Sequence, residues 1–310
     1  MSLLFGFDES NLPQGGCVAI GNFDGVHKGH QLMITRLVAL AQKKETSSVI
    51  LTFSPHPIEL LRPQHAPPWL STLEQKAELL QQYGIDDVIA YPIDLKFLQR
   101  SPRQFFDEII QKRLQAVGMV EGENFCFGHK RSGNIETLQT LCNQFHVELD
   151  VLKAVKIDGE PVSSTRIRNT IAAGEMQQAV TLLGHPYYLQ GNVVSGEKRG
   201  RELGFPTANL SDVKTLIPAE GVYAGIVHHA NAHWIAAINI GSNPTFKQNQ
   251  QKLEVHLLDY QGDLYHQNLT IGFLQKIRSV KQFASKEELQ YQLQIDIKDI
   301  RKVVEQQKDC

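Results

Sequence analysis

The chain has 310 residues, of which 42% are hydrophobic and 21% charged, and its 31 Lys and Arg nearly balance its 33 Asp and Glu. This length predicts two domains, and the composition excludes a disordered, collagen-like or membrane-embedded chain. Basic residues number 17 against 20 acidic ones up to residue 184, and 14 against 13 after it. Because neither half is basic, we expect no nucleic-acid partner. The composition indicates a soluble protein that handles small molecules.

The ends of the chain and its cysteines bear on the compartment. The first ten residues, MSLLFGFDES, lack the basic and apolar regions of a secretory signal. The sequence has no stretch of about 18 apolar residues that could cross a membrane. The cysteines form no C-x-x-C pair or zinc-like spacing, which favours reduced thiols in a cytoplasmic protein without a membrane partner. They are Cys17, Cys126, Cys142 and Cys310.

Strand-like and helical segments alternate from residue 17 to about residue 155. Short β-branched or apolar runs predict strands, and amphipathic runs predict helices. Alternating elements of this length favour a parallel sheet with helices on both faces. The expected strands are CVAI (17–20), SVILTF (48–53), DVIAY (87–91) and VELDVLKAV (147–155), and the expected helices cover 29–44, 73–84 and 101–114.

The pattern changes after about Gly184, where β-branched runs are separated by Gly, Asn or Pro. This spacing is typical of an antiparallel sheet or small barrel. We therefore expect two domains, residues 1–184 and 185–310. Ser285 and Glu288 form a capping box that starts a last helix. The expected strands cover 187–196, 221–229, 233–241, 252–260 and 268–277, and the helix covers 285–307.

The segment GNFDGVHKGH (21–30) directly follows the first expected strand of the N-terminal half, CVAI (17–20). A strand, a glycine-rich turn and a helix start form an anion site, because free backbone N–H groups and the helix dipole point at the ligand. His27 and His30 are three residues apart, so both rings can lie on one side and donate to a triphosphate. A glycine-rich turn with two surface histidines stays open as an alternative. Zinc has weak support, since a third ligand is missing.

Polar residues in the C-terminal half suggest a second site. In the segment GRELGFPTANL, Thr207 and Asn209 bring two oxygen ligands to one side, which suits Mg²⁺ held together with substrate phosphates. An ordinary strand connection with an Asx-type turn would give the same pattern. Glu254 lies inside an apolar run, where a solvent-facing carboxylate is the default expectation. On a face that lines a cavity, it could accept a proton from a substrate hydroxyl.

Four segments of the N-terminal half together resemble the nucleotidyltransferase superfamily in the form of bacterial FAD synthetases. GNFDGVHKGH is similar to the H-x-G-H signature, FSPHP (53–57) to a Phe-x-Pro-x-Pro segment, GENFCFGHKRSGN (122–134) to a Gly-x-Asp/Asn-Phe-x-Phe-Gly segment, and SSTRIR (163–168) to a Ser-Ser-Thr-x-Ile-Arg element. The resemblance implies a Rossmann-like α/β fold of the HxGH type in which His27 and His30 are catalytic. Cys126 departs from the family, which has a basic residue there.

The same resemblance implies the residues of two ligand sites. Alone, SSTRIR would be a helix N-cap followed by basic residues, although Arg168 could grip a phosphate with two parallel hydrogen bonds. The implied nucleotide contacts are Gly21, Asn22, Phe23, Asp24, Gly25, Gly29, Asn124, Ser163, Ser164, Thr165 and Arg168, and the implied flavin contacts are Phe53, Pro55, Pro57 and Asn124.

The C-terminal half resembles the riboflavin kinase domain, a small antiparallel Greek-key β-barrel. The similar segments are GFPTAN, GVYA (221–224), NIGSNPT (239–245), LEVHLLD (253–259) and IRSVKQF (277–283). The resemblance implies that Glu254 is the catalytic base. His266 departs from the family, which usually has Gly there, and we expect an effect on a local turn. The implied ligand contacts are Thr207 and Asn209 for Mg²⁺, Gly204 and Pro206 for the nucleotide, and Arg278 and Phe283 for the flavin.

Together these resemblances imply a bifunctional enzyme of flavin cofactor biosynthesis. It would phosphorylate riboflavin to FMN and adenylylate FMN to FAD, with ATP as co-substrate of both reactions and Mg²⁺ as cofactor. One alternative is a nucleotidyltransferase for another phosphomonoester with a non-catalytic flavin-binding barrel. Another is a flavin-binding protein without activity. The order of the motifs favours the bifunctional enzyme, and the sequence predicts no particular protein partner.

Overall fold

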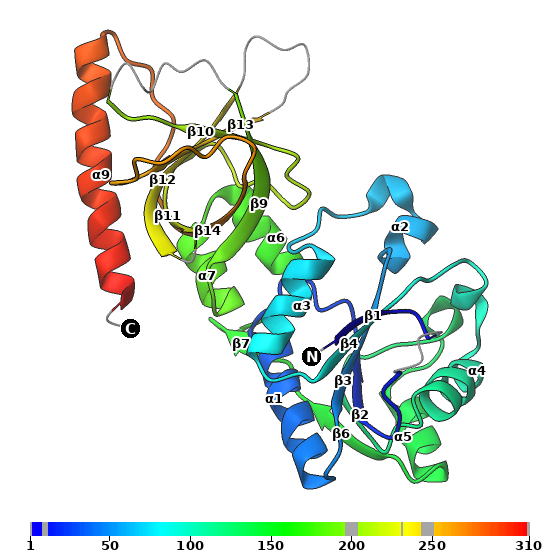
Figure 1. Cartoon of the computed structure of the whole chain (residues 1–310). Helices are drawn as coiled ribbons and strands as arrows, with labels where there is room; N and C mark the ends of the chain where they lie inside the picture. Colours follow the sequence, from blue (N-terminus) through cyan, green and yellow to red (C-terminus); the bar gives the residue numbers. More distant parts are fainter. Residues whose placement is uncertain (1, 8–11, 196–203, 231, 243–250, 309–310) are drawn as a thin grey trace. The chain divides into compact units, whose positions relative to one another are not determined.

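A computed structural model describes residues 2–7, 12–195, 204–230, 232–242 and 251–308, in two compact units (Figure 1). The first unit is Met1–Pro67 with Thr72–Ser163, and the second is Pro68–Ser71 with Ser164–Cys310. The second unit thus includes two helices that precede the boundary expected at residue 184: the helix at 176–183 contacts C-terminal strands, and the helix at 164–173 packs on that helix.

Some expected features lie outside the described residues. These are positions 200–203 of the GRELGFPTANL segment, 243–245 of NIGSNPT, and Cys310.

The first unit contains a six-stranded sheet with the order β1-β4-β3-β2-β5-β6, in which all pairings are parallel. From β2 the chain adds β3 and then β4 on one side, and after β4 it crosses to the other side of β2, where it adds β5 and then β6. The boundary between β2 and β5 is therefore a switch point, at which the order of successive strands reverses. In open α/β sheets, ligands bind at the carboxyl ends of the strands at such a switch point. The strands are β1 (Ser2–Phe5), β2 (Cys17–Ile20), β3 (Ser48–Phe53), β4 (Asp87–Tyr91), β5 (Gly118–Gly122) and β6 (Glu148–Leu152).

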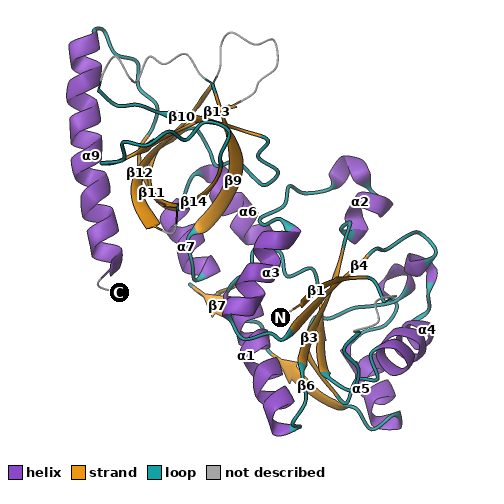
Figure 2. Ribbon diagram, viewed as in Figure 1, coloured by secondary structure: helices purple, strands orange, loops and turns teal. Residues whose placement is uncertain are grey.

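Helices cover both faces of this sheet (Figure 2). On one face, Ile34, Leu37 and Leu80 of two helices pack on Ala19 and Ile50 of the strands. A second cluster covers the other face and includes Phe106 and Leu138. The helices are α1 (Lys28–Lys43), α2 (Pro57–Leu61), α3 (Leu73–Gln82), α4 (Pro102–Phe105), its π-helical continuation η3 (Phe106–Arg113) and α5 (Ile135–Gln144); short 3-10 turns η1 (Pro63–His65), η2 (Phe97–Gln99) and η4 (His129–Arg131) and the ribbon β7 (Lys156–Ile157) and β8 (Glu160–Pro161) complete the unit.

The second unit is a closed antiparallel barrel with the order β10-β13-β12-β11-β14-β9. Three consecutive strands form hairpins and a fourth returns beside them, which is the Greek-key arrangement. Tyr187, Tyr223 and Phe273 are completely buried inside the barrel unit. The elements are α6 (Ser164–Ala173), α7 (Met176–Leu183), β9 (Tyr187–Val194), β10 (Ala208–Ser211), β11 (Gly221–His229), β12 (Ala232–Ser242), β13 (Gln251–Leu257), β14 (Asn268–Arg278) and α9 (Lys286–Lys308).

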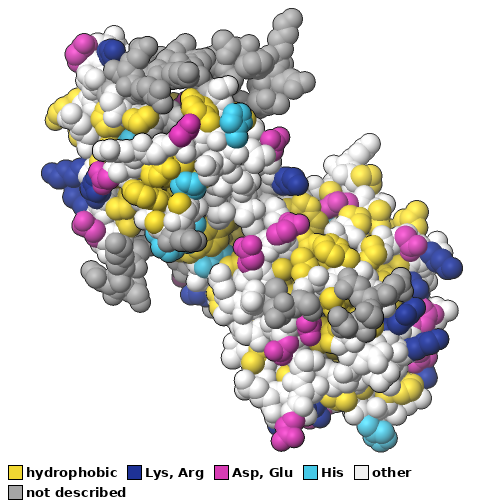
Figure 3. Space-filling model, viewed as in Figure 1, with side chains coloured by type: hydrophobic (Ala, Val, Ile, Leu, Met, Phe, Trp, Pro, Cys, Tyr) yellow, Lys and Arg dark blue, Asp and Glu magenta, His cyan; other side chains and the backbone are white. Residues whose placement is uncertain are grey.

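The predicted architecture, a Rossmann-like parallel sheet followed by a small Greek-key barrel and a C-terminal helix, is confirmed. Among the described residues, no helix is long and apolar enough to cross a membrane. Basic and acidic side chains are interspersed over the face seen in Figure 3.

Candidate functional site

The loop between β2 and α1 has an unusual backbone. Phe23 and Val26 have φ angles of +47° and +39°, a region that L-residues rarely adopt, and Gly25 has +77°. Burial holds this conformation in place, since the Phe23 side chain is 1% exposed and Val26 is fully buried. Such strain costs on the order of 1–3 kcal/mol for each residue and persists where the surrounding packing enforces it.

His27 and His30 lie on the same side of the start of α1. Their rings stack with centroids 3.6 Å apart and planes 15° apart. Nδ1 of His27 accepts the backbone N–H of His30 at 3.4 Å, so His27 caps the helix. A Cβ atom on Gly29 would come within 3.1 Å of the His27 ring. A larger residue at position 29 would therefore press on the His27 ring of the stacked pair.

The environment of His30 favours a neutral ring. Burial lowers the pKa of His30 well below its usual value, and the charges of His27 and Lys76 lower it further. Nδ1 of His30 is buried and accepts or donates no hydrogen bond within the described residues. At neutral pH this ring is an uncharged imidazole, which can donate one hydrogen bond to a ligand.

Lys76 lies beneath this loop and was not expected from the sequence. Its side chain is 2% exposed, and Nζ donates to Oγ1 of Thr52 at 3.3 Å. The Thr52 hydroxyl in turn donates to the carbonyl of Asn22 at 3.3 Å. Burial lowers the pKa of Lys76 to about 8, while the nearby Asp24 carboxylate opposes this shift. A buried ammonium group therefore stabilises the loop from the side of β3 and α3.

The FSPHP segment contributes one residue that was not expected to take part. His56 caps α2, because its Nδ1 accepts the N–H of Ile58 at 3.1 Å. Its Nε2 lies 2.8 Å from the side-chain amide of Asn22. The ring thus connects the end of β3 with the loop after β2. The sequence signal for this role was the position of the histidine directly before Pro57, because proline is favoured at the first position of a helix.

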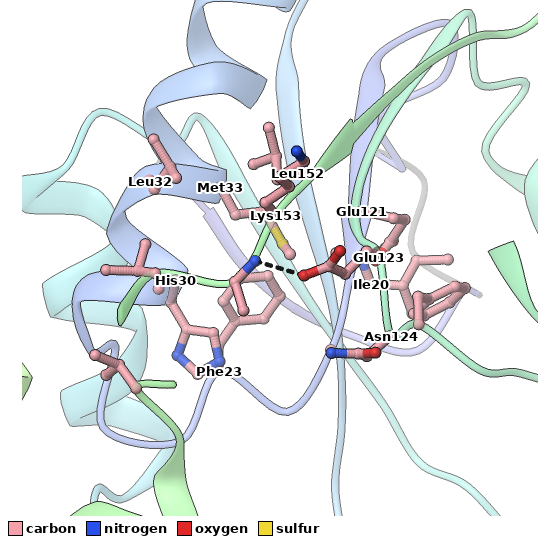
Figure 4. A pocket seen from close by; sticks show the side chains of 17 residues that line it. Ile20, Phe23, His30, Leu32, Met33, Glu121, Glu123, Asn124, Leu152 and Lys153 are labelled. Carbon is pink, nitrogen blue, oxygen red and sulfur yellow. Dashed lines mark hydrogen bonds between the residues drawn. The ribbon is translucent and has the colours of Figure 1, made fainter. Parts of the chain in front are cut away.

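A cavity of about 220 Å³ opens at the switch point, between the ends of β2, β5 and β6 (Figure 4). Glu123 shapes its wall, since its Oε1 accepts the N–H of Ala154 at 2.9 Å. Among the expected site residues, the structure brings five to the cavity: the catalytic candidate His30 and the nucleotide candidates Gly21, Phe23, Gly29 and Asn124. Other expected residues lie in the loop or at the end of β3 without lining it: Asn22, Asp24, Gly25, His27, Phe53, Pro55 and Pro57.

Glu121 is a second buried titratable residue near this cavity. Pairing between β2 and β5 is confined to Cys17 and Val18, and the N–H of Ile20 donates instead to Oε1 of Glu121 at 2.8 Å. Its other oxygen, Oε2, makes no hydrogen bond within the described residues. Complete burial raises the pKa of Glu121 well above its usual value. The carboxyl group therefore satisfies a backbone donor where the two strands separate, and its burial favours the protonated form.

The SSTRIR segment spans the division between the units. Ser163 ends the first unit, whereas Ser164, Thr165 and Arg168 are described in the second, at the start of α6. Nε of Arg168 donates to the carbonyl of Pro68 at 2.7 Å. The role of these four residues at a nucleotide stays a prediction.

In the barrel, three polar residues form a row across adjacent strands. Asn209 of β10 is opposite Glu254 of β13, which is opposite Asn239 of β12. Nδ2 of Asn239 donates to Oε2 of Glu254 at 3.2 Å, and Nζ of Lys252 is 2.9 Å from Oε1. Leu253 and Val255 face the core, so the Glu254 side chain lies on the outer surface of the barrel, 22% exposed. The carboxylate is thus oriented by two partners while staying accessible.

Thr207 and Asn209 offer the donors that a hard cation prefers. Thr207 is exposed, Asn209 is half-buried beside Glu254, and neither side chain is engaged within the part of the chain that the structure describes. A hydroxyl and an amide oxygen fit Mg²⁺ that takes its other ligands from phosphate and water. Gly204 and Pro206 lie in the connection that leads into β10.

Arg278, expected at the flavin, is engaged with helix α9. Its Nε and one terminal nitrogen donate to the buried Asp296 carboxylate at 2.8–3.0 Å. The guanidinium carbon is also 5.7 Å from the centre of the Phe283 ring. Arg278 therefore joins β14 to α9 and orients Phe283.

Comparisons with known proteins agree with both halves. A family model described as FAD synthetase matches residues 9–166, and one described as riboflavin kinase matches residues 183–304. Proteins named bifunctional riboflavin kinase/FMN adenylyltransferase from Escherichia coli (strain K12) and Pseudomonas fluorescens are 35% and 36% identical over 299 residues, 96% of each chain. A solved structure from Streptococcus pneumoniae, named macrolide-efflux protein, has a TM-score of 0.89 and 30% identity, and covers 96% of this chain and 98% of that one.

Proposed function

This chain belongs to the bifunctional riboflavin kinase/FMN adenylyltransferase family, and we propose that residues 185–310 carry the kinase and residues 1–184 the adenylyltransferase. The enzyme phosphorylates riboflavin with ATP to FMN and ADP, and joins FMN to a second ATP to give FAD and pyrophosphate. One observation carries the division of labour: the two family matches fall on two different folds, each with its own cluster of polar residues.

In the kinase half, Glu254 accepts the proton of the ribityl 5′-hydroxyl, whose oxygen attacks the γ-phosphate of ATP. Asn239 and Lys252 support this role because they hold the carboxylate in one orientation. Thr207 and Asn209 hold Mg²⁺, which neutralises phosphate charge when bound. Gly204 and Pro206 border the nucleotide, and Arg278 and Phe283 border the flavin.

In the adenylyltransferase half, a phosphate oxygen of FMN attacks the α-phosphate of ATP, and pyrophosphate leaves. His27 and His30 donate hydrogen bonds to the charge that develops there, and the N-terminus of α1 adds its dipole. Catalysis then consists of positioning and charge stabilisation, and it needs no covalent intermediate. Ser163, Ser164, Thr165 and Arg168 bind the phosphates, Asn124 lies between nucleotide and flavin, and Phe53, Pro55 and Pro57 border the flavin.

The protein acts on small molecules in the cytoplasm, without nucleic acid. The described cysteines Cys17, Cys126 and Cys142 are free thiols, which suits a reducing compartment. Burial raises the pKa of Cys17 to about 11 and that of Cys142 to about 12, so neither is a reactive thiolate.

A single incubation tests this function. The purified chain is mixed with riboflavin, ATP and Mg²⁺, and the flavins are separated by chromatography. FMN should form first and FAD should follow, with ADP and pyrophosphate as co-products. Riboflavin that stays unchanged, while another phosphomonoester is adenylylated, would favour the alternative of a barrel without catalysis.

A further inference from the structure

His256 lies two residues after Glu254 on the same outer face of β13. Its Nδ1 is 2.7 Å from the carbonyl oxygen of Pro206, the residue directly before Thr207. The His256 ring also meets the Phe205 ring edge to face, with centroids 5.8 Å apart. A side chain of the strand that carries Glu254 thus holds the backbone of the segment that carries Thr207.

The chemistry of this contact assigns the proton. A carbonyl oxygen only accepts, so Nδ1 of His256 must carry the hydrogen. Burial lowers the pKa of His256, although the Pro206 carbonyl and the Asp259 carboxylate oppose this shift. The Nδ1–H donor is present in both the neutral and the charged ring, so the bond does not depend on titration of His256.

We propose that His256 is a positioning residue of the kinase reaction, whose Nδ1–H bond to Pro206 orders the Thr207 segment for binding of Mg-ATP. This inference rests on the proposed metal ligands Thr207 and Asn209. Asn209 is fixed by its pairing in β10 opposite Glu254. Thr207 precedes the first residue of that strand, Ala208, so the Pro206 carbonyl is the nearest fixed point on its other side.

The test compares His256→Phe with His256→Asn. Phenylalanine keeps an aromatic ring against Phe205 but removes the donor, whereas the asparagine amide places an N–H near the position of Nδ1. The readouts are KM for Mg-ATP and kcat of riboflavin phosphorylation, and the rate of FMN conversion to FAD by the same chain. His233→Phe, at an exposed histidine of β12, is the matched control.

Removing this one hydrogen bond should raise KM for Mg-ATP about three- to tenfold in His256→Phe. The value of kcat should change less, because the bond orders the segment in ground and transition state alike. His256→Asn should recover most of the loss, and His233→Phe should match the wild type. FMN conversion to FAD should be unchanged in all three variants.

Three results would overturn the proposal. They are an unchanged KM in His256→Phe, an equal loss in the Phe and Asn variants, and a proportional loss of both activities, which would indicate damage to the whole chain. Thr207→Val, assayed in parallel, keeps the two proposals apart. If its Mg²⁺ requirement equals that of the wild type, the metal assignment fails even where His256 affects KM.

Discussion

Lys76 occupies a position where the helical pattern of α3 calls for an apolar side chain. It lies three residues after Leu73 and three before Leu79, on the buried face of the helix. The amphipathic pattern correctly predicted a helix here, but it did not indicate that a charged side chain lies within the apolar face. The reason for the lysine is tertiary: it is the nearby Thr52 and Asp24 that make its burial tolerable.

Replacing this lysine should destabilise the first unit. In Lys76→Met the charge is removed while Asp24 stays buried, which should cost about 2–4 kcal/mol of the free energy of unfolding. The pKa of His30 should also rise, because a neighbouring positive charge is lost. Urea unfolding and NMR titration of the histidine measure the two effects.

Lys43→Met is the matched control for this experiment. Its ammonium forms an exposed ion pair with Glu148, so its removal should cost less than about 1 kcal/mol. Equal losses in the two variants would mean that Lys76 contributes no more than a surface charge.

Glu121 makes stability depend on pH. Its pKa in the folded chain is raised above the ordinary value of 4.5. The folded state therefore prefers the protonated group, and stability is lost as pH rises from 4.5 through the folded-state pKa. Glu121→Gln keeps an acceptor for the Ile20 N–H without titrating.

As the pH rises from 5 to 8, the free energy of unfolding of the variant should therefore increase by about 1–3 kcal/mol relative to that of the wild type. Chemical unfolding at the two pH values measures the gain. A difference between variant and wild type that is the same at both pH values would show that the group does not titrate in this window.

Among the elements, strands with β-branched runs were predicted to the residue, as in β2, β3, β4 and β11. Those that were missed are short: β1, β5 and β10 have four or five residues, and β7 and β8 have two each. Their lengths and compositions carry little periodic signal, and they become strands because neighbouring strands offer hydrogen bonds.

The capping box of the last helix formed with one difference. Oγ of Ser285 accepts the N–H of Glu288 as expected. The Glu288 carboxylate reaches the N–H of Ala284 rather than that of Ser285. The helix accordingly begins at Lys286 and is fixed to β14 through Asp296, a contact that the local pattern could not indicate.

The connection between β13 and β14 contains His266, at the position where the family resemblance led us to expect glycine. His266 has φ of +60°, a conformation that glycine adopts without strain. His266→Gly should raise the free energy of unfolding by about 0.5–1 kcal/mol, measured by thermal or urea unfolding. His233→Gly, within β12, should instead destabilise the barrel, because glycine weakens a strand. A loss of stability in His266→Gly would contradict this account of the turn.

For the molecule as a whole, the near-neutral net charge agrees with ligands that are bound by a few local groups. Phosphate binding is proposed for a strained loop, a helix N-terminus and a few side chains rather than for a basic surface. Motif order indicated both folds and the positions of His27, His30 and Glu254. It did not indicate Lys76, Glu121 or His256, whose roles arise from partners far away in the sequence.

The most direct test of the central claim is the flavin profile of two single variants, each incubated with riboflavin, ATP and Mg²⁺. His27→Ala should accumulate FMN and form at least about a hundredfold less FAD, since it loses a group that stabilises transition-state charge. Glu254→Ala should leave riboflavin unphosphorylated but convert added FMN to FAD at the wild-type rate. If either substitution abolished both reactions in a folded chain, or left both unchanged, the assignment of one reaction to each half would be wrong.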